Sequence, residues 1–140
     1  MTQIRALFAG LVAVFLVAAA PASAAEVQPY SPEALAEAQS AGKPILVDVY
    51  AAWCPTCRAQ KPIIEDLTQQ PKYKNLLILR ADFDKDKEDL KALNVRSQST
   101  LIVFKGGDEL VRSVGSTSPV AIEGMLDPVS YTHLRAHETF

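Results

Sequence analysis

The segment Trp53-Cys54-Pro55-Thr56-Cys57 constrains this chain most, because it contains the only two cysteines among 140 residues. An apolar stretch rich in β-branched residues precedes it at 44–52 and predicts a buried strand. Apolar residues then recur at helical spacing over 58–70. The cysteines therefore fall where a strand leads into a helix. The amide N–H groups and dipole of a helix start favour an anion, so a thiol there has a lowered pKa and is a ready nucleophile.

Two cysteines in this position can form a redox-active dithiol, part of a metal site or a structural disulfide. A structural zinc site needs four ligands, and the chain has no third cysteine. A disulfide that closes so short a loop constrains the unfolded chain little. We therefore favour the redox-active dithiol over the metal and structural alternatives.

Residues 1–25 have the pattern of a secretory signal peptide: a basic start at Arg5, an apolar run over 6–20, and small residues up to the cleavage site. We expect cleavage after Ala24 or Ala25, and a periplasmic or secreted protein in a compartment where disulfides form. The alternative is an uncleaved membrane anchor, although the apolar run is short against the roughly 20 residues that span a bilayer.

The last residues, 128–140, differ from the rest of the chain. They show no apolar period and contain both histidines, His133 and His137. The string 129–139 resembles a translated sequencing adaptor found on unrelated predicted proteins, so we interpret 128–140 as an atypical tail and a possible sequence artefact. One domain is then expected over 26–127.

Within this domain the pattern predicts alternating helices and strands, after a short lead-in at 26–30. A helix starts at Ser31-Pro32 and ends at Gly42, which the 44–52 strand follows. The later elements are the helix that starts near Cys57, a strand at 76–83, a helix at 84–94, strands at 100–104 and 110–114 around Gly106-Gly107, and a helix over 118–126. This order predicts an α/β fold with a parallel core and one antiparallel edge strand added by the closing hairpin.

Asp48 interrupts the apolar strand before the cysteines. A buried carboxylate is costly unless it has a partner or a function. It could form an ion pair with Lys43 or another base, or it could accept a proton beneath the cysteine pair. We favour the proton acceptor, because this strand leads directly to the cysteines.

Together these features resemble the thioredoxin family over about 31–126. The matching positions are the buried acid Asp48, the motif residues Trp53, Cys54 and Cys57, the helix-kinking Pro62, the hairpin at 104–107 and Val114-Gly115, while Arg80 stands where many members carry lysine. The resemblance implies a thioredoxin-like fold, with a central mixed β-sheet flanked by helices. It also implies a protein-disulfide oxidoreductase whose only redox group is the Cys54–Cys57 pair, with no further cofactor. Pro55-Thr56 and Arg58-Ala59 resemble exported members that serve cytochrome c maturation.

One position departs from the family. The family carries a cis-proline just before a Thr-Leu pair, and Ser99 precedes Thr100-Leu101 here. A cis bond without proline costs about 2.5–4 kcal/mol, so the Gln98–Ser99 peptide is either strained and cis, or trans in a reshaped loop. In the family this loop faces the cysteines. Because the proline is absent from this loop, a metal or iron–sulfur site that uses Cys54 and Cys57 across a dimer stays an alternative.

The resemblance implies a role for each site residue. Cys54 is the exposed nucleophile, the more buried Cys57 resolves the mixed disulfide, and Asp48 is the base that takes the Cys57 proton through a water. Substrate-binding roles are expected for Trp53, Pro55, Thr56, Ser99 and Thr100.

The expected direction of electron transfer and the expected partners also come from the resemblance to the thioredoxin family. Strong oxidants of the family tend to carry histidine between the cysteines, and Thr56 brings no positive charge, so we expect a reductant. A reductant in an oxidising compartment needs a membrane electron-donor reductase, and its substrates are protein thiols and disulfides. A net charge of −2 without a Lys/Arg cluster gives no indication of nucleic-acid binding, and we expect a monomer. A non-catalytic chaperone or binding module with the same fold is a further alternative.

Overall fold

The computed structural model describes residues 24–130. The predicted signal peptide, except for Ala24 and Ala25, and the tail beyond Ser130, with His133 and His137, lie outside the described residues. No helix within 24–130 is long and apolar enough to cross a membrane.

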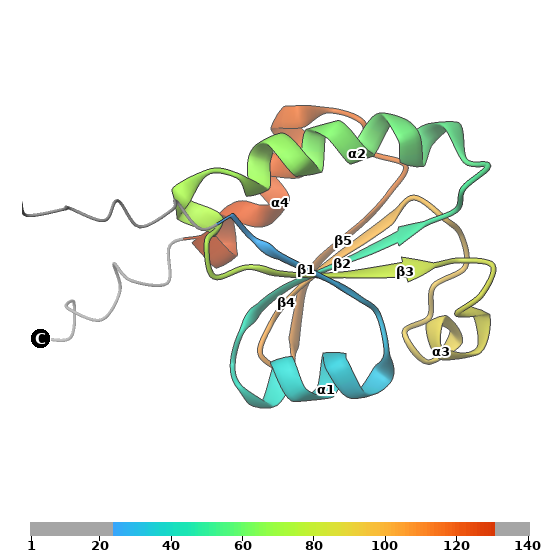
Figure 1. Ribbon diagram of the computed structural model, residues 1–140, viewed down its shortest axis with the longest axis horizontal. Helices are drawn as coiled ribbons and strands as arrows, with labels where there is room; N and C mark the ends of the chain where they lie inside the picture. Colours follow the sequence, from blue (N-terminus) through green and yellow to red (C-terminus); the bar gives the residue numbers. More distant parts are fainter. Residues whose placement is uncertain (1–23, 131–140) are drawn as a thin grey trace, which may run out of the picture.

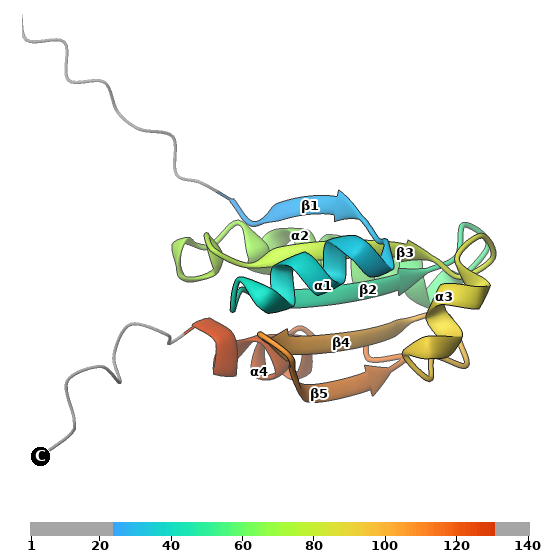
Figure 2. The same ribbon diagram turned by 90° about the horizontal axis from the view of Figure 1, so that it is seen from below.

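A mixed five-stranded sheet forms the centre of the domain, with the strand order β1-β3-β2-β4-β5 (Figure 2). The strands are β1 (Glu26–Pro29), β2 (Pro44–Tyr50), β3 (Leu77–Asp82), β4 (Thr100–Lys105) and β5 (Asp108–Val114). β1, β3 and β2 are parallel, whereas β4 is antiparallel to both of its neighbours, β2 and β5. The predicted α/β fold with a central mixed sheet is confirmed.

Helices cover both faces of this sheet (Figure 1). α1 (Pro32–Ser40) and α3 (Lys87–Ala92) lie on one side, and α2 (Pro55–Thr68) and α4 (Pro119–Ser130) lie on the other; a short 3-10 turn, η1 (Pro71–Tyr73), follows α2. The first helix begins as predicted, because the Ser31 hydroxyl accepts a hydrogen bond from the Ala34 N–H (3.1 Å).

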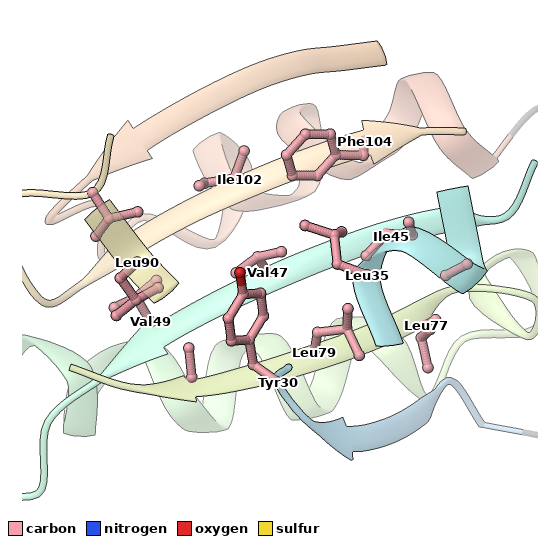
Figure 3. Packing of buried hydrophobic residues seen from close by; sticks show 13 residues of the cluster. Tyr30, Leu35, Ile45, Val47, Val49, Leu77, Leu79, Leu90, Ile102 and Phe104 are labelled. Atoms are coloured by element: carbon pink, nitrogen blue, oxygen red, sulfur yellow. The ribbon is translucent and has the colours of Figure 1, made fainter. Parts of the chain in front are cut away.

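Alternate residues of β2 supply two apolar cores. Ile45, Val47 and Val49 join the core beneath α1 and α3, where Leu35 and Leu90 pack on them (Figure 3). Leu46 joins the core beneath α2 and α4, which includes Ile64, Leu67, Ile122 and Leu126. Because strand side chains alternate, Asp48 lies on the same sheet face as Leu46, beneath α2.

The prediction of a parallel third strand is wrong, because β4 runs antiparallel to β2. A parallel crossover must carry the chain back along the full length of a strand. The six-residue α3 is about 9 Å long, against about 20 Å for the six residues of β3. The chain therefore enters β4 from the end where β3 stops.

Several elements also differ in extent from the predictions. The lead-in is an edge strand, since residues 26–29 pair with β3 from Glu26↔Leu77 onward. α3 begins later than residue 84, because the Asp82 carboxylate accepts hydrogen bonds from the N–H groups of Asp84 and Lys85 and holds a turn there. α4 continues past residue 126 to Ser130, with Val129 buried in the core.

Candidate active site

The two cysteines lie at the start of α2, just beyond the end of β2. Cys54 is the N-cap of the helix, and Pro55 occupies the first helical position, where its missing N–H loses no hydrogen bond. The Cys54 sulfur accepts a hydrogen bond from the Cys57 N–H at 3.1 Å, in the manner of a capping oxygen. Both cysteines are free thiols, so the structure represents the reduced state.

Both cysteines are covered, and the prediction that Cys54 is the exposed one is wrong. The exposed fraction is 1% for Cys54 and 6% for Cys57. The Ser99 hydroxyl contacts both sulfurs, and the sulfurs pack in a small cluster with Ala51. Attack on a substrate disulfide therefore requires the surface next to Cys54 to open when a substrate docks.

The two thiols nevertheless differ in acidity. Burial raises the pKa of Cys54, but hydrogen bonds from the Cys57 thiol, the Ser99 hydroxyl and the N–H groups of Cys57 and Thr56 outweigh it, and the net pKa is lowered. Burial and the hydrogen bond with the Cys54 sulfur raise the pKa of Cys57. Of the two thiols, Cys54 is therefore the one that loses its proton more readily, and Cys57 is the one that keeps it.

The loop before β4 contains the Gln98–Ser99 peptide, which is trans. There is no cis peptide bond among residues 24–130, and Ser99 has a left-handed backbone with φ of +61°. Its N–H donates to the Val49 carbonyl oxygen at 2.8 Å. The Ser99 oxygen lies 3.1 Å from the Cys54 sulfur and 3.2 Å from the Cys57 sulfur. The loop is thus trans and reshaped, with the serine side chain against both sulfurs.

The remaining predicted substrate-binding residues fall into two groups. Trp53 is 56% exposed, Pro55 is exposed and Thr56 is half-buried, so all three offer surface beside the cysteines. Thr100 is buried, and its hydroxyl donates to the Ser97 carbonyl oxygen at 2.7 Å. The Thr100 hydroxyl is therefore engaged within the loop.

Asp48 is buried, with 7% of its surface exposed, and the nearest base is Arg80 on β3 rather than Lys43. The Arg80 Nε lies 3.6 Å from the Asp48 carboxylate, and the guanidinium stacks 4.5 Å from the centre of the Tyr50 ring. Burial raises the pKa of Asp48, and Arg80 lowers it by less. A cavity of about 70 Å³ lined by both side chains is large enough for water.

Sequence reasoning missed two residues that contact this site. The Trp53 indole N–H donates to the Asp84 carboxylate at 2.8 Å, a contact across the turn after β3 that no local pattern indicates. Gln60 is 1% exposed, and its amide donates to the Ser99 carbonyl oxygen at 3.3 Å and the Ser116 carbonyl oxygen at 2.8 Å. A signal for Gln60 did exist, since it shares a helical face with Cys57 and Ile64.

The described residues show no group of side chains typical of a metal site within one chain. Within residues 24–130, no three His, Cys, Asp or Glu side chains are grouped where they could hold a metal ion. The two sulfurs instead take their hydrogen-bond partners from Ser99 and the start of α2. Neither this arrangement nor the comparisons below support the alternative of a metal or iron–sulfur module.

Comparison with known proteins identifies the family. The sequence model described as Thioredoxin matches residues 27–127. The chain belongs to the thioredoxin family. Thioredoxins are protein-disulfide oxidoreductases that need no cofactor, so this thioredoxin exchanges disulfides through the Cys54-x-x-Cys57 motif.

Individual relatives agree with this assignment. Thioredoxin Asp f 28 of Aspergillus fumigatus is 30% identical over 67% of this chain and 85% of its own length. The bifunctional thioredoxin reductase/thioredoxin of Mycobacterium leprae is 32% identical over 62% of this chain, which spans only 19% of that protein. The crystal structure of Trxlp from Edwardsiella tarda EIB202 is 44% identical, with a TM-score of 0.70, over 72% of this chain and 98% of that one. The thioredoxin-like fold is thereby confirmed.

The raised pKa of Asp48 predicts that its carboxylate destabilises the fold at neutral pH. Between the unfolded and folded pKa values the folded chain binds more protons, so the free energy of unfolding falls as the pH rises through this range. We expect Asp48→Asn to raise the free energy of unfolding at neutral pH. The gain should disappear below the ordinary carboxyl pKa of about 3.9.

Guanidinium unfolding of both proteins across this pH range measures the effect. Arg80→Gln is the matched variant, because it removes the ion pair but keeps the carboxylate, and it should lower stability at neutral pH. A loss of stability in Asp48→Asn at neutral pH would mean that the ion pair outweighs the burial of the charge.

Proposed function

We propose that this thioredoxin is an exported reductant that passes electrons from a membrane reductase to disulfides in other exported proteins. The observation that carries the proposal is the unequal pair of thiols. The Cys54 sulfur caps α2 and has a lowered pKa, while the pKa of Cys57 is raised. Such a pair holds a thiolate ready to attack and a second thiol in reserve.

In the first step the Cys54 thiolate attacks one sulfur of the substrate disulfide. A bond forms between the Cys54 sulfur and that substrate sulfur, the substrate disulfide breaks, and the second substrate sulfur leaves as a thiolate that takes a proton from water. The Cys57 N–H at 3.1 Å stabilises the Cys54 thiolate before the attack.

In the second step Cys57 loses its proton and attacks the Cys54 sulfur. The Cys54–Cys57 disulfide forms, and the remaining substrate sulfur leaves as a thiolate. Two electrons have then passed from the dithiol to the substrate. We assign Asp48 as the proton acceptor through water, because its raised pKa suits a base and it lies on the sheet face covered by α2, the helix that carries Cys57.

Substrates are proposed to dock on the surface around Trp53, Pro55 and Thr56. Trp53 presents an exposed indole whose N–H is fixed to Asp84, which gives a flat apolar surface at low cost in side-chain entropy. Contact there would displace the cover over Cys54. We propose that a monomer is sufficient, since both cysteines and Asp48 come from one chain.

Export and direction rest on separate features. The signal-peptide pattern of 1–25 supports export, and a reductant in an oxidising compartment must be recharged from the membrane. Thr56 places no cation beside the Cys54 thiolate, which favours a low or middling reduction potential.

The mechanism predicts that the two cysteine variants behave differently. Cys54→Ser should abolish the reduction of a model protein disulfide, because the nucleophile is absent. Cys57→Ser should still attack and then stop at the mixed disulfide, which non-reducing electrophoresis detects as a covalent adduct.

The double variant Cys54→Ser/Cys57→Ser is the control and should form no adduct. An adduct that forms on Cys57 in Cys54→Ser, but not on Cys54 in Cys57→Ser, would reverse the assignment of the nucleophile. Retained biological function in Cys54→Ser would favour the non-catalytic binding module.

The reducing direction predicts a reduction potential at or below about −230 mV for the Cys54–Cys57 pair. Equilibration of the mature protein in glutathione buffers of known ratio, followed by thiol trapping, measures it. A value near about −120 mV would identify an oxidant and overturn the direction.

The signal-peptide interpretation predicts a mature chain that begins at Ala25 or Glu26 in the exported fraction. The Ala25 N–H donates to the Thr68 carbonyl oxygen at 3.1 Å, and Ala25 packs against the core beneath α2. Cleavage after Ala24 would keep both contacts. N-terminal sequencing of protein from the exported and membrane fractions tests this, and an intact leader in the membrane fraction would indicate an anchor.

A further inference from the structure

We propose that Ser99 is a catalytic residue of this thioredoxin, whose hydroxyl stabilises the reduced cysteine pair, and that Gln60 positions it. The inference rests on the proposed role of Cys54 as the nucleophile. It gives Ser99 a role in the chemistry of the sulfurs in place of a role in substrate contact alone.

The distances around the Ser99 hydroxyl define one consistent set of hydrogen bonds. Its oxygen lies 3.1 Å from the Cys54 sulfur and 3.2 Å from the Cys57 sulfur, within reach of both. A hydroxyl has one proton to donate and can accept others, whereas a thiolate can only accept. When Cys54 is deprotonated, Ser99 therefore donates its one proton to the Cys54 thiolate, and the Cys57 thiol donates its proton to the same sulfur.

This arrangement exists only in the reduced state. When the Cys54–Cys57 disulfide forms, Cys54 loses its negative charge, so the Ser99 hydroxyl loses its charged acceptor. A hydrogen bond to a charged group is stronger than one between neutral groups. Ser99 thus stabilises the dithiol relative to the disulfide and raises the reduction potential of the pair.

The backbone at Ser99 is held in a conformation that serine rarely adopts. Its φ of +61° lies in the left-handed region, which carries a steric penalty for residues other than glycine. Hydrogen bonds on both sides hold it there: the Ser99 N–H donates to the Val49 carbonyl oxygen (2.8 Å), and its carbonyl oxygen accepts from the Gly115 N–H (2.9 Å). Such strain persists only where the surroundings over-determine it.

Gln60 supplies the remaining support from inside the protein. Its amide nitrogen bridges the Ser99 carbonyl oxygen (3.3 Å) and the Ser116 carbonyl oxygen (2.8 Å), and so joins the loop before β4 to the loop after β5. The amide oxygen of Gln60 is buried without a hydrogen-bond partner within residues 24–130. An apolar residue would avoid the desolvation penalty of that unpaired oxygen, so the amide is costly for folding and its contribution is to hold Ser99.

The experiment compares Ser99→Gly and Ser99→Ala with the wild type. Both variants lack the hydroxyl, but glycine accepts a positive φ without strain and alanine does not. We expect both to reduce the thiolate fraction of Cys54 about tenfold at a pH below its pKa, measured by ultraviolet thiolate absorbance during a pH titration. A tenfold shift of the equilibrium from the dithiol toward the disulfide corresponds to a reduction potential about 30 mV more negative in glutathione buffers.

Gln60→Leu tests the positioning role. We expect it to raise the Cys54 pKa and lower the potential in the same direction as Ser99→Gly. In the Ser99→Gly background it should change neither quantity further, because the hydroxyl that Gln60 positions is absent. An equal effect in both backgrounds would show that Gln60 acts without Ser99 and would overturn its positioning role.

Ser31→Ala is the matched control. It removes a serine hydroxyl that caps α1 on the opposite face of the sheet, so it should destabilise the fold and leave the Cys54 pKa and the potential unchanged. An unchanged pKa and potential in Ser99→Gly would overturn the proposal. If the pH titration of the wild type shows no thiol with a pKa below the ordinary cysteine value, the assignment of Cys54 as the nucleophile fails instead.

Discussion

The hydrogen bond from the Ser99 N–H to the Val49 carbonyl oxygen, 2.8 Å long, determines the geometry of this active site. It lies next to the last pair of the antiparallel β2–β4 register, Val49 with Thr100, and is offset from that register by one residue. The same register directs Val49 and Ile102 into one core and Leu46 and Leu101 into the other. A slip of one residue would exchange the two faces and separate Ser99 from the cysteines.

The site concentrates groups that weaken the fold. Asp48 is a carboxylate inside an apolar layer, Gln60 leaves an amide oxygen unpaired, and Ser99 has a strained backbone. Each costs on the order of 1–3 kcal/mol, against a typical net stability of about 5–15 kcal/mol. The apolar cores on both faces of the sheet offset these terms.

The parts of the site that depend on local sequence could be predicted, and the parts that depend on distant contacts could not. The position of Cys54 at the start of α2 follows from the strand and helix patterns on either side of it. The burial of Cys54 depends on Ser99, 45 residues away, and the role of Gln60 depends on carbonyl groups 39 and 56 residues away. Likewise β1, with four residues, is too short to show an alternating apolar pattern. The direction of β4 depends on how few residues of the connection between β3 and β4 are helical.

Ser99 also shows why this loop is not simply a thioredoxin loop with its proline removed. Proline fixes φ near −65° and has no N–H, so it could neither adopt the φ of +61° found here nor donate to the Val49 carbonyl oxygen. A proline at this position would need a different loop, and the hydroxyl between the sulfurs would be lost with it. The serine, its left-handed backbone and the Gln60 amide that supports its carbonyl group therefore form one interdependent arrangement. In this thioredoxin the residue facing the cysteines can take part in the hydrogen bonding of the thiols, which a proline side chain cannot do.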